Sequence, residues 1–284
     1  MTYFSTMQTQ KIKYYPTTIE AIHLLVLYVF LQSLIDFPLA LYDYYHDTDW
    51  LSNSWISSIS SFVITAFIFV FAYRKAKNSF VKVFAVKGFN PLIIIPIVIM
   101  LPGMQYLVGL LNIEINKILP PPPWFWELFE RIFDNHFGFW GTFAKVVILA
   151  PIVEEILFRG IIMHGLMRNY RGWYAVLLSG ILFSFFHLNP WQMTYTFFLG
   201  LLLGWVMLRT RSLPLAILIH ALNNLVVLLT ITWNNEISEH ALYHLSRNHN
   251  ILISSMAIVV GTFLIFVFTL KKNKATKKQV APKQ

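Results

Sequence analysis

Long apolar runs separated by short polar blocks make up most of the chain. A bilayer core of about 30 Å needs about 20 apolar residues of helix to cross it. Eight segments come close to that length, approximately 19–41, 55–73, 92–111, 141–167, 173–188, 191–208, 213–233 and 251–270. This pattern predicts an all-α polytopic membrane protein with about eight transmembrane helices. We expect residues 19–270 to form a single transmembrane domain.

Basic residues gather in the polar blocks on one side of these segments. Most of the Lys and Arg lie in residues 11–13, 74–87, 168–171, 209–211 and 271–284, whereas the alternate blocks are mainly acidic. Basic blocks mark the cytoplasmic side of a membrane protein. Both termini are therefore predicted to be cytoplasmic, as an even number of spans also requires. Residues 1–18 form the N-terminal segment, and the lysine-rich tail 271–284 is expected to be disordered near anionic lipid head groups.

Composition narrows the function classes further. Apolar residues make up 57% of the chain and charged residues 12%, against about 25% charged residues in ordinary soluble domains. A soluble enzyme, a disordered regulator and a free nucleic-acid binder all fit this composition poorly. The net charge of +9 comes mostly from the basic blocks, so no nucleic-acid partner is expected. The chain has no cysteine, which excludes disulfides, thiolate metal sites and a cysteine nucleophile.

An unusual proline and aromatic segment follows the third apolar run. Residues 120–123 are four prolines, and five aromatic residues follow them, namely Trp124, Phe125, Trp126, Phe129 and Phe133. We predict a stiff polyproline stretch that leads into an amphipathic helix at the membrane interface. An aromatic anchor is the favoured interpretation, and a lip that guards lateral access of a substrate is the alternative.

Charged side chains inside a span are costly and are candidates for function. The fourth predicted span contains Glu154, Glu155 and Arg159. Glu155 and Arg159 are four residues apart, so they share a helix face and can form an ion pair. Glu154 is rotated by about 100° from Glu155 and is left as the free carboxylate. An unpaired carboxylate in a site of low dielectric constant suits a general base.

Two later spans supply the remaining polar groups. His187 ends the fifth span, and it could share a water molecule with Glu154. His220 and Asn224 are four residues apart in the seventh span, so both point to one side of it. Their N–H groups could stabilise a developing oxyanion. Water activated by Glu154 and His187, facing donors from His220 and Asn224, would make a hydrolase site.

Each of these motifs also has a structural interpretation. A Glu–Arg pair in a membrane can be a clasp or the proton relay of a transporter. A single His or Asn can simply bond a neighbouring helix. A transporter is disfavoured because the chain shows no internal repeat. A non-catalytic membrane immunity or scaffold protein on the same fold remains the alternative to an enzyme.

The three motifs together resemble one family. Glu154-Glu155-x-x-x-Arg159, Phe183-x-x-x-His187 and His220-x-x-x-Asn224 occur in this order on successive predicted helices. They resemble the type II CAAX prenyl proteases, also called the CPBP family (CAAX proteases and bacteriocin-processing enzymes) or Abi family. The resemblance covers about residues 141–233. It implies an intramembrane endopeptidase with eight helices and a catalytic cavity within the bilayer.

The resemblance also implies roles for the motif residues. Glu154 and His187 would activate water, and His220 and Asn224 would stabilise the oxyanion. Glu155 and Arg159 would support the site, and Phe183 would pack beside His187.

Whether a metal takes part is open at this stage. The family is commonly labelled as metalloproteases, and Glu154, His187 and His220 could bind a divalent metal such as zinc with an open water position. In zinc proteases the spacing His-Glu-x-x-His places two metal ligands on one helix. This spacing does not occur in the chain. A metal-free mechanism with Glu154 as the base explains the motifs equally well, and we favour it.

The expected partners are the lipid bilayer and a membrane-associated peptide or protein. Eukaryotic members of the family trim three residues after a prenylated cysteine, and bacterial relatives are associated with peptide maturation or bacteriocin self-protection. We expect this protein in the plasma membrane of a bacterium, where a leader or pheromone precursor is a better substrate than a prenylated protein.

Overall fold

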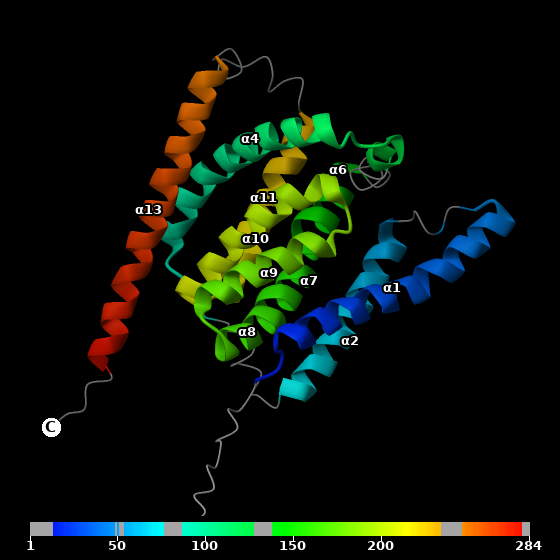
Figure 1. The fold of residues 1–284 in the computed structure, drawn as a ribbon, viewed down its shortest axis with the longest axis horizontal. Helices are drawn as coiled ribbons and strands as arrows, with labels where there is room; N and C mark the ends of the chain where they lie inside the picture. Colours follow the sequence, from blue (N-terminus) through cyan, green and yellow to red (C-terminus); the bar gives the residue numbers. More distant parts are fainter. Residues whose placement is uncertain are drawn as a thin grey trace, which may run out of the picture.

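The computed structural model describes residues 14–48, 50, 54–76, 87–127, 138–233 and 246–279. Within these residues the chain is a bundle of helices with no β-strand, as predicted (Figure 1). Each of the eight apolar segments coincides with helix. In chain order, the main helices are α1 (Thr18–His46), α2 (Ser54–Ala76), α4 (Ile94–Ile118), α9 (Gly172–Phe186), α10 (Pro190–Thr210), α11 (Leu213–Thr232) and α13 (Arg247–Gln279), together with the helix 138–169 between α4 and α9.

Six helices are long and apolar enough to cross a membrane, judged by length and composition over the described residues. They are α1, α2, α4, α10, α11 and α13. The segment predicted at 173–188 is the shorter apolar helix α9. The segment predicted at 141–167 is helical throughout, but it consists of short α-helical and π-helical stretches and contains charged residues. The number of eight spans therefore stays a prediction, although all eight segments are helical.

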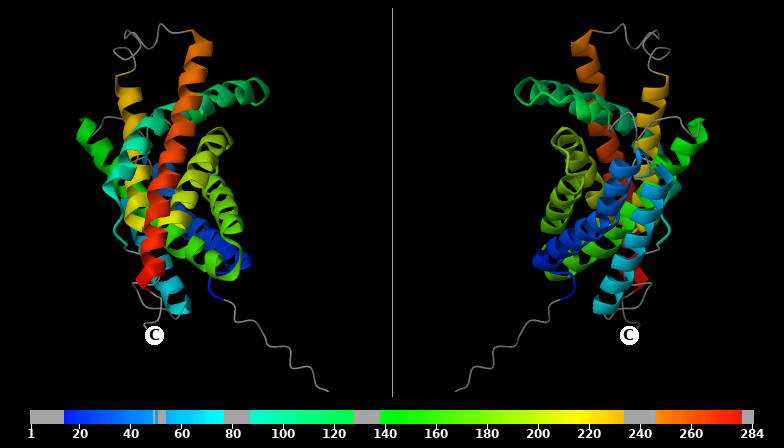
Figure 2. Two further views of the ribbon diagram at one scale, coloured as in Figure 1. Left: turned by 90° about the vertical axis from the view of Figure 1, so that its left-hand side faces the viewer. Right: turned by 90° about the vertical axis from the view of Figure 1, so that its right-hand side faces the viewer.

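The start of α1 and the end of α13 lie at the same end of the bundle (Figures 1 and 2). Which side of a membrane this end faces stays a prediction. Tyr14, which lies just before α1, is attached to the end of the helix 138–169, because its backbone N–H donates to Asn169 Oδ1 at 2.8 Å.

The prediction of a disordered tail is wrong for its first part, because α13 continues past Leu270 to Gln279. Lysine, alanine and glutamine are good helix formers, and extending an existing helix avoids the cost of nucleation.

Local sequence sets where the helices near the site begin. Thr17 caps α1 in a capping box with Glu20, which satisfies backbone N–H groups that have no partner inside the helix. Asn189 caps α10 and Ser212 caps α11, and each cap is followed by a proline in the first helical turn. Proline is tolerated there because the N–H it lacks would be unpaired in any case. The turns between α9, α10 and α11 are therefore short and locally specified.

The helix that carries the Glu-Glu motif is continuous from Gly138 to Asn169 but changes its winding twice. It consists of α6 (Gly138–Thr142), the π-helical segment η3 (Phe143–Leu149), α7 (Ala150–Glu155), the π-helical segment η4 (Ile156–Ile162) and α8 (Met163–Asn169). Such π-helical turns are rare and often lie at functional sites. They widen the helix and rotate the side chains that follow.

The winding of η3 leaves one carbonyl group without a backbone partner. The N–H of Ala150 bonds the carbonyl of Lys145, five residues earlier. The next bond of this series would run from residue 151 to the carbonyl of Val146, but Pro151 has no N–H. The Val146 carbonyl must therefore find a donor on another element.

Two pairs of helices pack closely, α9 with α10 and α4 with α13 (Figure 2). Glycines allow the first contact, because a Cβ atom on Gly200 would lie 2.9 Å from the Cα of Gly180. Between α4, α9, α10 and α13 lies a cavity of about 720 Å³ with an almost wholly apolar lining. None of the predicted site residues lines this cavity, so it is separate from the site described below.

Candidate active site

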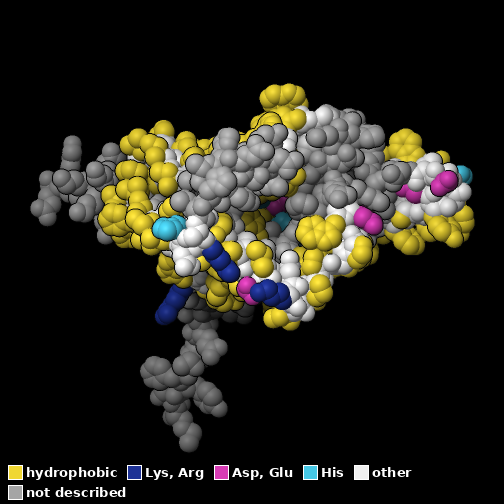
Figure 3. Space-filling model, turned by 90° about the horizontal axis from the view of Figure 1, so that it is seen from above, with side chains coloured by type: hydrophobic (Ala, Val, Ile, Leu, Met, Phe, Trp, Pro, Cys, Tyr) yellow, Lys and Arg dark blue, Asp and Glu magenta, His cyan; other side chains and the backbone are white. Residues whose placement is uncertain are grey.

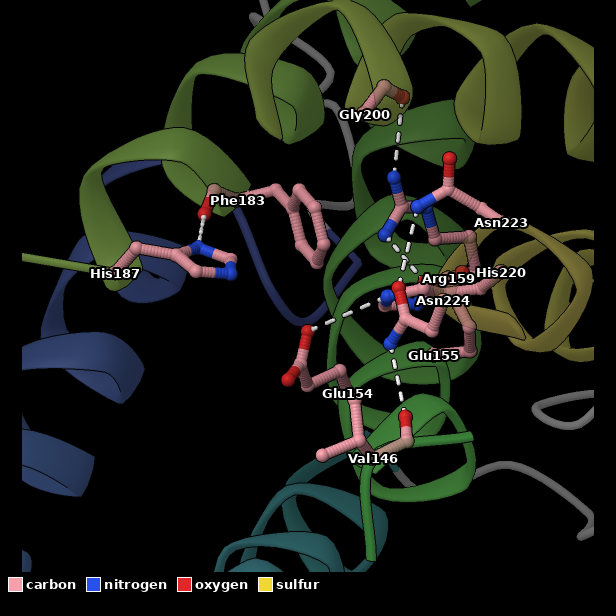
Figure 4. A network of polar contacts seen from close by, with 10 residues as sticks. All are labelled: Val146, Glu154, Glu155, Arg159, Phe183, His187, Gly200, His220, Asn223 and Asn224. Atoms are coloured by element: carbon pink, nitrogen blue, oxygen red, sulfur yellow. Dashed lines mark hydrogen bonds and ion pairs between the residues drawn. The ribbon is translucent and has the colours of Figure 1, made fainter. Parts of the chain in front are cut away.

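A buried ion pair lies at the centre of the predicted site (Figure 4). Arg159 Nη1 donates to Glu155 Oε1 at 2.9 Å, and both side chains are 0% exposed. Arg159 Nη2 donates to the carbonyl of Gly200 on α10 at 3.0 Å. The guanidinium carbon also lies 4.6 Å from the centre of the Phe183 ring. Arg159 therefore joins its own helix to α9 and α10, and it pairs with Glu155 as the spacing predicts.

Glu155 also fixes the ring of His220 from α11. His220 Nδ1 lies 2.9 Å from Glu155 Oε1. Because a carboxylate can only accept, we assign the proton to Nδ1, which leaves Nε2 of the neutral ring as an acceptor. The sequence predicted a clasp between Glu155 and Arg159, but not that the same carboxylate would orient a histidine from another helix.

Glu154 faces His220 with one oxygen that has no partner. Its Oε2 atom is buried and makes no hydrogen bond within the described residues. The same atom lies 4.0 Å from His220 Nε2. That separation is too long for a direct hydrogen bond, and a water molecule is a group that could link two polar atoms at such a distance. The side chain of Glu154 is 19% exposed, so the free carboxylate is not sealed off.

Phe183 and His187 complete the group from α9 and the turn after it. The fully buried Phe183 ring lies 5.1 Å from the His187 ring and 5.6 Å from the His220 ring. This is the place beside His187 that the family resemblance implies. His187 Nδ1 donates to the carbonyl of Phe183 at 2.9 Å, so Nε2 of the neutral ring is again an acceptor. Figure 4 shows His187 and Glu154 on the same side of Phe183, with no hydrogen bond between them.

Asn224 is engaged in a different contact from the predicted one. Its Nδ2 donates to the carbonyl of Val146 at 2.9 Å, the group that Pro151 leaves without a backbone donor. Its Oδ1 accepts from Asn223 Nδ2 at 3.1 Å. One N–H of the Asn224 amide is therefore committed to the helix that carries Glu154, and the second N–H is the one that could reach an oxyanion.

In addition to Val146, sequence analysis missed several residues that the structure places in this network. Gly200 accepts from Arg159, Asn223 bonds Asn224, and the hydroxyl of Tyr195 on α10 donates to Asn223 Oδ1. Asn223 is 1% exposed, and an asparagine in an apolar span was a usable signal for it. A glycine that accepts through its backbone carries no such signal.

The predicted metal ligands do not converge in this arrangement. Glu154, His187 and His220 do not form a cluster of the kind that holds a metal ion, and no other three His, Asp or Glu side chains do so among the described residues. The two histidines resemble metal ligands in one respect, because each bonds a protein oxygen through Nδ1 and leaves Nε2 available. Because the three groups do not form such a cluster together, no step of the reaction below is assigned to a metal.

The end of the molecule opposite the start of α1 and the end of α13 is the face seen in Figure 3. Viewed from that end, an acidic side chain and a histidine side chain are recessed between apolar side chains near the centre of the face (Figure 3).

Part of the predicted proline and aromatic segment belongs to the described residues, and its residues 123–127 are helical. Trp124 and Phe125 pack on Trp191 at the start of α10, with ring centres 5.4 and 5.2 Å apart. Phe129 and Phe133 lie outside the described residues.

The comparison with protein families bears directly on this arrangement. Residues 136–226 match the family model described as Type II CAAX prenyl endopeptidase Rce1-like. The resemblance to type II CAAX prenyl endopeptidases is thereby confirmed. The matched segment includes every predicted site residue from Glu154 to Asn224.

Comparisons with curated proteins and with solved structures give no significant match. Together with the apolar helices, the match over residues 136–226 indicates an integral membrane protein that contains a segment similar to type II CAAX prenyl endopeptidases.

Proposed function

We propose that this protein is an intramembrane endopeptidase that hydrolyses a peptide bond in a membrane-associated peptide or protein. The observation that carries the proposal is the unpartnered Glu154 Oε2, which is buried and lies 4.0 Å from His220 Nε2. A carboxylate oxygen and a histidine nitrogen at this separation can hold one water molecule between them. The family match supports an endopeptidase of this general kind.

In the proposed reaction, the bridging water attacks the carbonyl carbon of the peptide bond. Glu154 takes one proton from the water as its oxygen forms the new bond to carbon, and general-base catalysis of this kind contributes about 10²–10⁴-fold. The carbonyl oxygen becomes the oxyanion of a tetrahedral intermediate. Glu154 then returns the proton to the nitrogen of the leaving amine as the C–N bond breaks, so that one water is consumed for each bond cleaved.

The oxyanion needs donors, and the hydrogen bonds restrict which groups can supply them. His220 bonds Glu155 through Nδ1, so its Nε2 can donate only when the ring carries a second proton, and the proposed reaction starts from His220 in this protonated form rather than as the neutral ring described above. The Glu155 carboxylate stabilises that form electrostatically, and Arg159 holds the carboxylate in place. We assign oxyanion stabilisation to protonated His220, with the second N–H of Asn224 as a further donor. His187 Nε2 is assigned a supporting contact to the water.

The setting of the site restricts the substrate. The site residues lie on helices between long apolar helices that are able to cross a membrane, so a substrate must bring its peptide bond to membrane depth. A lipidated protein or a hydrophobic leader or pheromone precursor has this property. We propose such a substrate, and the plasma membrane of a bacterium as the location.

The proposal is tested by comparing peptide termini in membranes and medium of cells that carry the native protein or Glu154→Gln at matched expression. Glutamine has the shape of glutamate but does not take the proton, so we expect specific termini to fall about 100-fold or more. Glu114→Gln is the matched control, because this carboxylate is exposed on α4 and pairs only with Lys117 among the described contacts. It should leave all termini unchanged.

Two results would contradict the proposal. Unchanged termini together with an intact phenotype in Glu154→Gln would favour the scaffold interpretation. Unchanged termini with a lost phenotype would favour a proton relay through Glu154.

A further inference from the structure

Tyr195 begins a directional chain of hydrogen bonds that ends at the helix carrying Glu154. Its hydroxyl donates to Asn223 Oδ1, Asn223 Nδ2 donates to Asn224 Oδ1, and Asn224 Nδ2 donates to the carbonyl of Val146. Figure 4 shows the last two links. The chain connects α10 through α11 to η3. Gln105 adds α4, because its Nε2 donates to the backbone carbonyl of Asn223 at 3.2 Å.

The chain has only one working direction. The Val146 carbonyl can only accept, so the Asn224 amide must point its nitrogen toward Val146 and its oxygen toward Asn223, and the Asn223 amide must in turn point its oxygen toward Tyr195. The Tyr195 hydroxyl can donate or accept, and here it donates to that oxygen. Without the hydroxyl, Asn223 Oδ1 loses its hydrogen-bond donor. Asn223 is 1% exposed, so water cannot readily replace the lost donor.

The far end of the chain lies at the Val146 carbonyl of the helix that carries Glu154. The Val146 carbonyl lacks its backbone donor because Pro151 has no N–H. Pro151 also lies in the first turn of α7, which carries Glu154 and Glu155. The Asn224 amide therefore ties α11 to the junction of η3 and α7, in addition to the bond of His220 with Glu155.

We infer that Tyr195 is a positioning residue of the proposed active site: through Asn223 and Asn224 it fixes the junction of η3 and α7, and with it the direction of the Glu154 carboxylate. The inference rests on the proposed function for its effect on cleavage, but not for its effect on the helix. A displacement of the base by a fraction of an ångström affects the transition state more than substrate binding. Loss of the Tyr195 hydroxyl should therefore lower kcat and leave KM nearly unchanged.

The test uses the full-length protein in lipid nanodiscs and four variants. They are Tyr195→Phe, Asn224→Ala, the double variant, and Thr196→Val as the matched control. Thr196 lies beside Tyr195 on α10 and also loses a hydroxyl, but that hydroxyl bonds only carbonyls of its own helix. Amide hydrogen exchange is followed by mass spectrometry over residues 143–155, with residues 172–186 as the internal reference.

We expect Tyr195→Phe to speed exchange in 143–155 by about fivefold or more and to leave 172–186 unchanged. Asn224→Ala should do the same, and the double variant should be no faster than Asn224→Ala alone, because both changes break one chain. On a substrate found by the comparison of termini, kcat of Tyr195→Phe should fall about tenfold with KM within about twofold. Thr196→Val should behave as the native protein.

Other results would overturn the inference or separate it from the proposed function. Unchanged exchange in 143–155 for Tyr195→Phe would overturn it. Faster exchange in both segments would also overturn it, since Tyr195 would then be a packing residue. If the variants show the expected exchange pattern but the native protein cleaves nothing, the effect of Tyr195 on the helix would stand and the proposed protease activity would be refuted.

Discussion

The buried pair of Arg159 and Glu155 allows a quantitative test of how the site is held together. We consider Arg159→Leu, which keeps an apolar side chain of moderate size but removes the charge. In the structure this change leaves the Glu155 carboxylate 0% exposed and without its cation. It also removes the donor to the carbonyl of Gly200 and the contact over the Phe183 ring.

The expected loss of stability follows from these contacts. Removing one partner of a buried ion pair costs about 3–5 kcal/mol, because the remaining charge is buried and uncompensated. Replacing both charges avoids that cost. The double variant Glu155→Gln with Arg159→Leu should therefore recover most of the stability that Arg159→Leu loses, ending within about 2 kcal/mol of the native protein. The amide oxygen that Glu155→Gln introduces can still accept from His220 Nδ1, so the histidine keeps a partner.

The free energy of unfolding is measured by denaturant titration in mixed micelles, followed by far-UV circular dichroism. Lys117→Leu is the control, because the pair of Lys117 and Glu114 has the same charges but exposed side chains; no measurable change is expected there. A loss below about 1 kcal/mol for Arg159→Leu would refute the reasoning, as would a double variant that is less stable than Arg159→Leu. The first result would mean that water reaches Glu155, and the second that the Glu155 carboxylate contributes stability through a partner other than Arg159, such as His220.

Two further predictions concern the helix contact behind Arg159 and the role of metals. Gly200→Ala should lower both stability and cleavage, because the added Cβ would lie 2.9 Å from the Cα of Gly180 and must push α9 away from α10. Thermal unfolding and cleavage rates measure this effect. Gly109→Ala is the control, since nothing lies within 4 Å of its added Cβ. Cleavage should survive chelation of divalent metals, because Glu154, His187 and His220 do not converge; activity that is lost with EDTA and restored by zinc would contradict this.

Much of the fold could be predicted from the sequence because helix formation in a membrane is a local requirement. A backbone in a lipid environment must satisfy its hydrogen bonds internally, so each long apolar run had to become helix, and each one did. The pairing of Glu155 with Arg159 was equally predictable, since residues four apart on a helix are neighbours whatever surrounds them. The extension of α13 beyond Leu270 was missed because a charged composition was taken as a sign of disorder, although its residues favour helix.

The catalytic roles proposed for the site residues stay predictions, but the structure changes which of them are neighbours. Glu154 and His187 were expected to share a water, which stays a prediction, and the structure adds His220 Nε2 at 4.0 Å from Glu154. The predicted role of Asn224 as an oxyanion donor also stays a prediction, and the structure shows that one of its N–H groups bonds the Val146 carbonyl. The residues that make these contacts lie on or beside a helix with π-helical segments on both sides of α7. The hydrophobic periodicity of the sequence does not predict such segments.

The sequence by itself determined the helices, the membrane setting, the local ion pair and the set of polar residues from which a site could be built. Only the tertiary structure decided that Glu155 orients a histidine 65 positions away, that Arg159 bonds a glycine carbonyl 41 positions away, and that an asparagine replaces the donor missing at Pro151. The physical reason is that helical periodicity fixes neighbours within one helix. Contacts between helices depend on their rotation and depth against one another, and these are set by side-chain packing and by small residues such as Gly180 and Gly200.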